Sequence, residues 1–370
     1  MSKKIKVCHF SSVHQDLDTR IFYKECVSLA EAGFEVHYVV PNAISRVEKN
    51  VQIHSFELKT SSRFQRMRQT TKAVYKRALE LDADIYHFHD PELLPFGLKL
   101  KRKGKKVIYD AHEDVPRQIL SKYWIPGIIR KLTSRAFEAY EDYVAKRLAH
   151  VVVSTPTIEE RFTKVNPNST AICNYPILSE NTNPAPWNER KNEICYIGGL
   201  TEIRGIKEIV QAMEYHASLT LNLAGTFSPI EFRDEVSKIN GWDKVIEHGY
   251  VGRQEIVNIL NRSKIGMVTL YPQDNYLDSL PIKLYEYMLA EIPVVASNFP
   301  LWQQIISDCD CGICVDPKDP KAIADAQTEI LKNDRRAEQM GKNGRKAVLE
   351  KFNWTIESEK LVKIYNQLVK

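Results

Sequence analysis

The sequence has no run of about eighteen apolar residues, so we expect no helix that spans a bilayer. Its first residues enter a strand-like pattern directly and lack the apolar stretch of a secretory signal. Glycine and proline are few, 15 and 17 in 370 residues, while 43% of residues are apolar and 27% are charged. This is the composition of a globular protein, which we expect in the cytoplasm, and the length favours two domains.

Signals for metals and redox cofactors are weak. The loop after the first predicted strand lacks the G-x-G-x-x-G spacing of a dinucleotide site, which argues against a nicotinamide cofactor. Of the seven cysteines, Cys309, Cys311 and Cys314 lie close in sequence but have no fourth ligand at zinc spacing. The D-x-D triplet at 308–310 is too short to carry weight. We interpret the cysteines as reduced, structural thiols.

Short apolar runs alternate with amphipathic stretches along the whole chain. This alternation is typical of parallel sheets covered by helices. The predicted strands are 5–10, 35–40, 51–56, 85–89, 107–110, 151–154, 171–174, 194–197, 219–224, 245–248, 265–270, 294–296 and 313–315. The fold class is therefore α/β, with two Rossmann-like, doubly wound parallel-sheet domains facing a cleft.

An irregular, proline-containing connector interrupts the alternation at 174–190. We therefore place an N-terminal domain at 1–175 and a C-terminal domain at 191–353. The segment 354–370 is predicted to be a helix that crosses back to the N-terminal domain. Ligands bind at the carboxyl ends of the strands in such domains, so polar groups there are candidates for a site.

In the first half, His14, Asp18 and Arg20 follow the first strand and suit sugar hydroxyls or a phosphate. The alternative for Asp18 is a helix cap. His112 follows the strand 107–110 and is a candidate to contact a substrate hydroxyl. His87 and His89 should point to one face of the sheet, where a core or hydrogen-bonded role is favoured over a metal pair.

In the second half, a glycine turn and two helix starts carry positive charge. Gly198 and Gly199 would let a ligand approach the backbone. Arg204 and Lys207 place cations at the start of the next helix, against the helix dipole. A diphosphate would resolve that conflict.

The same conflict recurs at 277–288, where Asp278 precedes a helix that contains Lys283, Leu284 and Glu286. Pro281 should occupy the first helical turn, with the cap at 279 or 280. A phosphate at this helix start would account for Lys283, and Glu286 could accept two hydrogen bonds from a ribose diol. The alternative is an ordinary amphipathic helix.

With these residues in view, the whole chain resembles retaining nucleotide-sugar glycosyltransferases of the GT-B fold, in the large bacterial family 4. The pattern S-x-x-H-x-x-x-D-x-R-I-F-x-K-E at 11–25 and the stretch 109–113 are similar to those of surface-polysaccharide transferases. The family's two acids, eight residues apart, correspond to Asp278 and Glu286. The first is usually a glutamate, and here it is one methylene shorter.

The resemblance implies roles for these positions. Glu286 would hold the ribose hydroxyls, Asp278 would lie near the donor sugar, and His112 would contact the transferred sugar. Many members carry Gly-Arg where this chain has Gly198-Gly199, so Arg204 would take over as a phosphate ligand, with Lys283 as the second cation. Gly198, Gly199, Lys207 and Leu284 complete the expected donor site, and His14, Asp18 and Arg20 the acceptor side.

The implied reaction moves a sugar from a UDP- or GDP-sugar donor to a saccharide acceptor. Fixed cations and helix amides would stabilise the leaving nucleoside diphosphate, so neither a metal nor another cofactor is expected. Retention is implied by the family alone. Attack on the face of the leaving group and a short-lived covalent intermediate both remain open.

The segment 61–77 holds six cations and no acid, with Phe64, Met67 and Val74 as a sparse apolar stripe. Such a helix could lie on an anionic membrane, and the basic run 99–106 adds to it. We therefore expect a peripheral protein on the inner face of the plasma membrane that acts on a lipid-linked acceptor in lipopolysaccharide or capsule synthesis. A nucleic-acid partner is not expected, because no recognition module accompanies the charge.

Three other functions remain open. A nucleotide-sugar epimerase could use a similar two-domain cleft. A non-catalytic nucleotide-sugar-binding protein would result if Asp278 could not replace glutamate. A nicotinamide oxidoreductase is the least favoured of the three.

Overall fold

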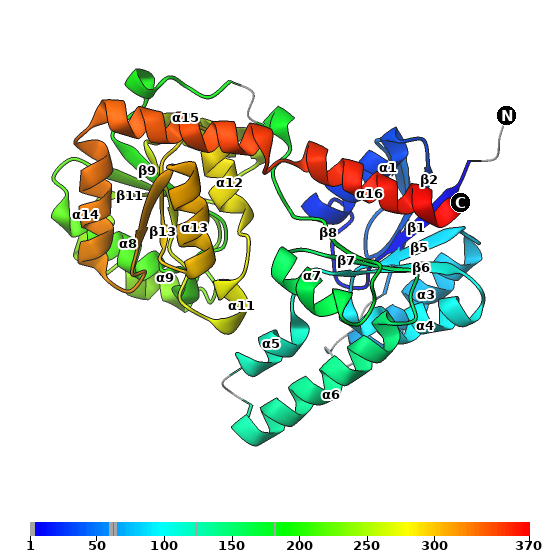
Figure 1. Cartoon of the computed structure of the whole chain (residues 1–370). Helices are drawn as coiled ribbons and strands as arrows, with labels where there is room; N and C mark the ends of the chain where they lie inside the picture. The colour runs from blue at the N-terminus through cyan, green and yellow to red at the C-terminus, as the bar shows by residue number, and fades with distance from the viewer. Residues whose placement is uncertain (1–3, 59–61, 63–64, 123–124, 181–182) are drawn as a thin grey trace. The chain divides into compact units, whose positions relative to one another are not determined.

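A computed structural model describes residues 4–58, 62, 65–122, 125–180 and 183–370 (Figure 1). It contains two compact units, Met1–Asn174 with Trp354–Lys370 (unit 1) and Tyr175–Asn353 (unit 2). The predicted irregular connector falls in unit 2, and the last helix falls in unit 1. None of the helices in the described ranges has both the length and the apolar character needed to cross a bilayer.

Unit 1 is built on an eight-stranded sheet in the order β3-β4-β2-β1-β5-β6-β7-β8. All neighbours pair in parallel except β3 with β4. The inner strands are almost wholly buried apolar runs, as expected for a parallel sheet covered on both faces. Their bounds are β1 Lys6–Phe10, β2 Glu35–Pro41, β3 Arg46–Glu48, β4 Val51–Phe56, β5 Ile85–Phe88, β6 Lys106–Ala111, β7 His150–Val153 and β8 Ser169–Ala171.

Helices cover both faces of this sheet. The π-helix η1, α1 and α16 contact one another on one face, while α3 and α4 lie against the other (Figure 1). The Trp354 indole Nε1 donates to Ser28 Oγ at 2.9 Å, which anchors α16 to α1. The helices are η1 Thr19–Cys26, α1 Val27–Glu31, η2 Arg66–Thr70, α3 Thr71–Glu80, η3 Pro91–Leu93, α4 Leu94–Arg102, α5 Val115–Leu120, α6 Gly127–Ala145, α7 Pro156–Thr163 and α16 Trp354–Val369.

Unit 2 has a six-stranded, all-parallel sheet in the order β11-β10-β9-β12-β13-β14. Its strands are β9 Glu193–Ile197, β10 Thr220–Ala224, β11 Val245–Gly249, β12 Ile265–Val268, β13 Val294–Ser297 and β14 Gly312–Val315. This order reverses at β9, where β10 lies on one side and β12 on the other. A crevice forms outside the strand ends at such a reversal, which directs attention to the turn after β9.

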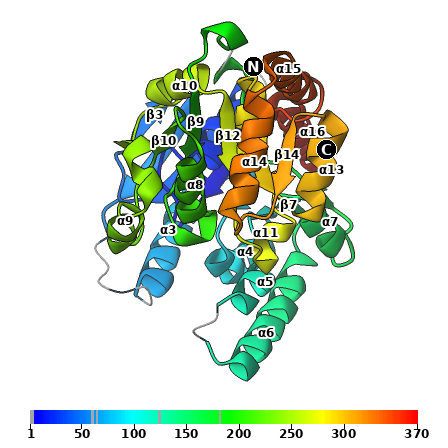
Figure 2. The ribbon, with the colours of Figure 1, turned by 90° about the vertical axis from the view of Figure 1, so that its left-hand side faces the viewer.

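The helices of unit 2 include α8 and α14, which pack against each other (Figure 2), and α12, which packs under the long α15 (Figure 1). Their bounds are η4 Leu178–Glu180, η5 Trp187–Glu189, η6 Glu202–Arg204, α8 Ile206–Ala212, η7 Met213–Tyr215, α9 Glu231–Val236, η8 Asn240–Lys244, α10 Arg253–Arg262, α11 Asp274–Leu277, α12 Ile282–Leu289, α13 Pro300–Cys309, α14 Pro320–Leu331 and α15 Asp334–Glu350.

The two-domain α/β prediction is confirmed, with local corrections. The short strand β3 was not predicted, and β8 ends at Ala171, where we placed its start. The π-helix η1 begins at Thr19, with Asp18 as its N-cap. Pro281 is the N-cap of α12 and not a residue of its first turn, because its ψ of 124° is extended.

Candidate functional site

At the turn after β9, two basic side chains lie close to the backbone of two glycines. Gly198 has a φ of +130°, which favours glycine. A Cβ placed on Gly198 would lie 2.7 Å from both Cε and Nζ of Lys283. A Cβ on Gly199 would lie 3.2 Å from Nη1 of Arg204. Both glycines are therefore needed so that the two basic side chains can reach the turn.

A second glycine fixes the approach of Arg204. The short helix η6 ends at Arg204, and Gly205 follows in the left-handed region with a φ of +69°. A Cβ at Gly205 would meet the Thr269 carbonyl oxygen at 2.2 Å. The chain turns back at this point, and Arg204 Nη1 donates to the Gly199 carbonyl at 3.3 Å.

Lys283 lies in the first turn of α12, with its Nζ 5.1 Å from the centre of the Tyr196 ring. Burial, followed by the charge of Arg204, lowers the pKa of Lys283 to about 7, although Glu286 opposes the shift. Within the described ranges, neither Lys283 nor Arg204 forms an ion pair. Two unneutralised cations at one glycine turn, beside the free amides of a helix start, form a site for a polyanion.

Glu286 lies one turn further along α12, and its side chain is 15% exposed. Its Oε1 accepts a hydrogen bond from Nη1 of Arg253 at 3.0 Å, and Arg253 also pairs with Glu180. The carboxylate is thus held in place, and Oε2 forms no hydrogen bond to a described residue. Asp278, directly after α11, is exposed.

Two other predicted donor-site residues are placed differently. Leu284 has no exposed surface, so its side chain packs in the core of unit 2 and is not available to a ligand. Burial of a leucine stabilises the fold by about 1.5–3 kcal/mol, which accounts for its presence. Lys207 is an exposed residue of α8, and no hydrogen bond among the described residues joins it to Arg204 or Lys283. The structure therefore brings together Gly198, Gly199, Arg204, Lys283 and Glu286.

In unit 1, His112 follows β6 and lies beside Asp110. Its Nε2 is 2.8 Å from Asp110 Oδ2 and 3.2 Å from Nδ1 of His89. The side chain is 20% exposed. Ser154 Oγ donates to the His112 carbonyl at 2.6 Å, which fixes the backbone. Nδ1 forms no hydrogen bond within the described part of the chain, so it can contact a ligand hydroxyl.

Arg20 and Asp18 serve the fold, contrary to their predicted acceptor-side role. Arg20 is 5% exposed, and its Nε and Nη2 donate to the two oxygens of Asp110 at 3.2 and 3.0 Å. Burial would raise the pKa of Asp110, but Arg20 and His112 hold it well below its usual range. Asp18 caps η1 by accepting from the amides of Arg20 and Ile21, both at 2.9 Å. The capping alternative was the correct one.

Sequence reasoning missed Asp90, which follows β5 and is 2% exposed. It accepts hydrogen bonds from Ser11 and Ser12 and pairs with His14 Nδ1 at 3.1 Å. Burial opposes ionisation of Asp90, but His14 and both serines lower its pKa to about 2. The His14 ring centre lies 5.2 Å from that of His112, so the two histidines form one polar surface. An acid directly after a strand was the available signal.

The predicted membrane helix needs a correction. Residues 63–64 and the side chain of Arg66 lie outside the described part, so the proposed role of Phe64 is not addressed. Val74 is completely buried, so it faces the core and not a membrane. Met67 is 44% exposed, and Arg68, Lys72 and Lys76 are exposed. Among the described residues of this segment, Val74 therefore does not belong to the predicted apolar stripe, and the exposed face is basic.

Comparisons with known proteins agree across the chain. Residues 20–174 match the model "Glycosyltransferase Family 4", and residues 179–347 match "Glycosyl transferases group 1". The phosphatidyl-myo-inositol mannosyltransferase of Mycobacterium leprae is 32% identical over 314 residues, which covers 80% of this chain and 78% of that protein.

Two solved structures share the fold. A sucrose-phosphate synthase from Thermosynechococcus elongatus has a TM-score of 0.80 at 18% identity, with 99% of both chains covered. The Anabaena protein HepE, solved with UDP, has a TM-score of 0.74 at 12% identity, covering 98% of this chain and all of the other. At these identities the structural likeness concerns the fold alone.

The pKa of Lys283 generates a prediction about anion binding. Inorganic pyrophosphate should restore the proton of Lys283, so binding above pH 7 requires proton uptake and the affinity should fall with rising pH. We expect a loss of about tenfold between pH 7 and 9, measured by isothermal titration calorimetry. Lys283→Arg, which stays charged, controls for titration of pyrophosphate itself. The same pH dependence in both proteins would contradict this prediction.

Proposed function

Because this chain belongs to the family 4 glycosyltransferases of the GT-B fold, we propose that it transfers a sugar with retention from a UDP- or GDP-sugar to a saccharide acceptor. The acceptor we propose is lipid-linked, and the product a surface polysaccharide such as lipopolysaccharide or capsule. The single observation that carries the donor assignment is the pair of cations, Arg204 and Lys283, held at the Gly198-Gly199 turn without a carboxylate partner among the described residues.

The chemistry follows from the leaving group. When the bond between the sugar and the diphosphate breaks, negative charge develops on the phosphate oxygens. Arg204 can offer a fork of donors, and a protonated Lys283 adds a point charge from the start of α12. These groups supply the charge stabilisation that a metal would otherwise provide, so the proposed transfer step needs no metal or other cofactor.

Glu286 in unit 2 and His112 in unit 1 each have a polar atom that we propose contacts a substrate. The free Oε2 of Glu286 can accept from a ribose hydroxyl while Arg253 fixes the other oxygen. His112 can accept a hydrogen bond at Nδ1 from a hydroxyl of the transferred sugar, because Nε2 donates to the Asp110 carboxylate, which orients the ring and leaves Nδ1 as the acceptor of the neutral imidazole. Asp278 is exposed and is proposed to lie near the donor sugar.

A peripheral position on the inner face of the plasma membrane would suit a lipid-linked acceptor. The M. leprae relative is named for a lipid acceptor, phosphatidyl-myo-inositol, which supports this assignment. In this chain α6 begins with Ile128, Ile129 and Leu132, which are 79%, 56% and 61% exposed. Lys131 and Arg135 are exposed beside them. Exposed aliphatic and basic side chains on one helix suit an anionic lipid surface.

Two other functions are distinguished by simple assays. A nucleotide-sugar epimerase would change the sugar without releasing nucleoside diphosphate, whereas a transferase releases it only when an acceptor is present. A non-catalytic binding protein would bind the donor and never turn it over. Neither alternative explains why a half-exposed histidine is oriented beside a buried aspartate in unit 1.

The donor site is tested first with a thermal-shift screen of UDP- and GDP-sugars, because a ligand raises the melting temperature according to its affinity. With the best nucleotide, Glu286→Ala should lower the affinity about tenfold to a hundredfold, as expected for hydrogen bonds to a charged group. Glu247→Ala removes a similar partly exposed partner of an arginine and should leave the affinity unchanged. Equal nucleotide affinity in the Glu286 variant and the parent would reject the assignment.

His112→Ala should lower turnover by about a hundredfold or more and change nucleotide affinity little, because we propose that its Nδ1 contacts the transferred sugar and not the diphosphate. The control is His54→Ala, another half-buried, hydrogen-bonded histidine of unit 1. Initial rates of nucleoside diphosphate release and direct titration with the nucleotide measure the two quantities. Unchanged turnover in the His112 variant would remove this role.

Ile129→Glu with Leu132→Glu should reduce co-sedimentation with vesicles that contain anionic lipid by about tenfold or more, since two apolar contacts are lost and two repulsive charges are gained. Ile44→Glu with Val47→Glu changes two exposed apolar residues elsewhere in unit 1 and serves as the matched control. If both double variants bind vesicles as the parent does, α6 is not a membrane contact.

A further inference from the structure

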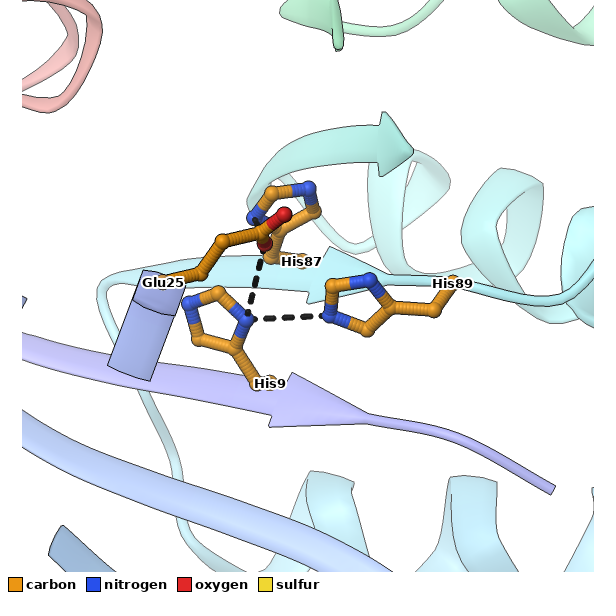
Figure 3. Close-up of side chains that lie close together, drawn as sticks. All are labelled: His9, Glu25, His87 and His89. Atoms are coloured by element: carbon orange, nitrogen blue, oxygen red, sulfur yellow. Dashed lines mark hydrogen bonds and ion pairs between the residues drawn. The ribbon is translucent and has the colours of Figure 1, made fainter. Parts of the chain in front are cut away.

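One face of the unit 1 sheet carries three histidines and a glutamate in a dry environment. The strands β1 and β5 pair His9 with His87, so both imidazoles point to the same face, and His89 lies two residues further along. The side chain of Glu25, a residue of η1, reaches the same face (Figure 3). All four side chains are buried, with at most 2% exposed.

The donor atoms of these four residues converge. Nδ1 of His9 lies 3.0 Å from Nε2 of His89. Oε2 of Glu25 lies 3.9 Å from Nδ1 of His9 and 3.9 Å from Nδ1 of His87. One ligand atom from each of the four lies within 4.8 Å of all the others. The dashed lines in Figure 3 mark these contacts around His9.

The glutamate is the unexplained member of the group. Neither of its carboxylate oxygens accepts a hydrogen bond from a described residue. Arg20 forms an ion pair with Glu25, with its Nε 3.1 Å from Oε1, but the three nitrogens of Arg20 donate to Asp110 and to the Ile172 carbonyl. The other carboxylate oxygen, Oε2, faces two imidazole nitrogens in a buried place, so it needs either a proton or a further cation.

We propose that His9, His87, His89 and Glu25 bind a zinc ion in unit 1. Four nitrogen and oxygen donors at about 2.0–2.2 Å from one ion lie about 3.4 Å apart, and the contacts of 3.0 and 3.9 Å lie on either side of that value. Burial lowers the pKa of all three histidines, which keeps them in the neutral form that binds metals. A closed set of four protein ligands is typical of a structural site.

The outer contacts of two of the three histidines, His9 and His89, match those of metal ligands. Nδ1 of His89 lies 3.2 Å from Asp110 Oδ2, and Nε2 of His9 lies 3.0 Å from the Tyr365 hydroxyl. Such partners fix the orientation of ligating imidazoles. The Tyr365 hydroxyl also contacts Nδ1 of His87 at 2.7 Å. When His87 Nδ1 binds the ion, Tyr365 would lose this contact and keep only its hydrogen bond to His9.

The ion would join β1, β5 and η1 and, through His89, set the position of Asp110 next to His112. It acts on the architecture of unit 1 and is separate from the diphosphate site of unit 2, so it takes no part in the transfer step proposed above. The competing arrangement is a protonated Glu25, whose pKa burial and the nearby Asp110 raise well above its usual range.

The experiment measures metal in the purified full chain. The protein is incubated with zinc, desalted and analysed by mass spectrometry for metal content, and a second sample is titrated with cobalt. We expect about one zinc ion per chain and the intense visible absorption of four-coordinate cobalt. His37→Ala is the matched control, since His37 is a buried histidine of β2 bonded to His54 and Glu35 and should leave the metal content unchanged.

Glu25→Gln separates the two arrangements. It mimics a protonated glutamate in shape but is a poor metal ligand, so the zinc content should fall at least about tenfold, as it should in His87→Asn. Zinc content at the parent's level in both variants would overturn the proposed ligand set. If the variants do not fold, the parent decides the matter, because no retained zinc and no four-coordinate cobalt spectrum would overturn the site outright.

Discussion

The donor half of the chain depends on holding two like charges at one turn. Arg204 and Lys283 approach the backbone at Gly198 and Gly199 because neither residue has a side chain, and no described carboxylate neutralises them there. Keeping both protonated costs on the order of a few kcal/mol, which the lowered pKa of Lys283 expresses. Such a cost is tolerated where a ligand removes it, so the anion completes the site. In the proposed transfer, binding energy and charge stabilisation of the leaving group would come from the same two side chains.

Unit 1 depends on a buried ion pair. Arg20 binds both oxygens of Asp110, and Asp110 orients His112 at the end of β6. The residues are 90 positions apart in sequence, yet the parallel order of β1, β5 and β6 brings the ends of these strands to one edge of the sheet. Removing either partner would leave an uncompensated buried charge, which typically costs 3–5 kcal/mol. Because disrupting this ion pair costs free energy, Asp110 stays in place and so positions His112.

The sequence was sufficient to predict features that depend on residues close together in the chain. Strands buried on both faces are apolar runs, so β9, β10 and β13 were located to within a residue. The turn at Gly198 and the cations near it were also recognised, because glycine and charge against a helix dipole leave a signal in sequence. Leu284 was misassigned for lack of a burial signal, since apolar residues occur in cores and at site edges alike.

Partners distant in sequence could not be predicted. Arg20 was predicted to bind a ligand because its partner, the carboxylate of Asp110, lies 90 residues away in sequence. Val74 was predicted to contact a membrane because periodicity does not say which face of a helix packs against the core. The same limit hid Asp90, whose partners Ser11, Ser12 and His14 lie on the neighbouring strand's loop. Each of these errors concerns a pairing made by the sheet order and not by the segment itself.

The polar residues buried on one face of the unit 1 sheet lower the stability of the fold compared with apolar residues. Parallel sheets usually bury aliphatic side chains on both faces, yet here His9, His87, His89 and Glu25 occupy positions that valine or leucine would fill at lower cost. His89 lies at the end of this group and contacts both Asp110 and His112. A chain of contacts therefore runs from the dry interior to the half-exposed histidine. A cation bound among the buried histidines would neutralise Glu25 and hold His89 in place, and His89 in turn contacts His112. Apolar side chains on this face could orient neither the buried cluster nor His112.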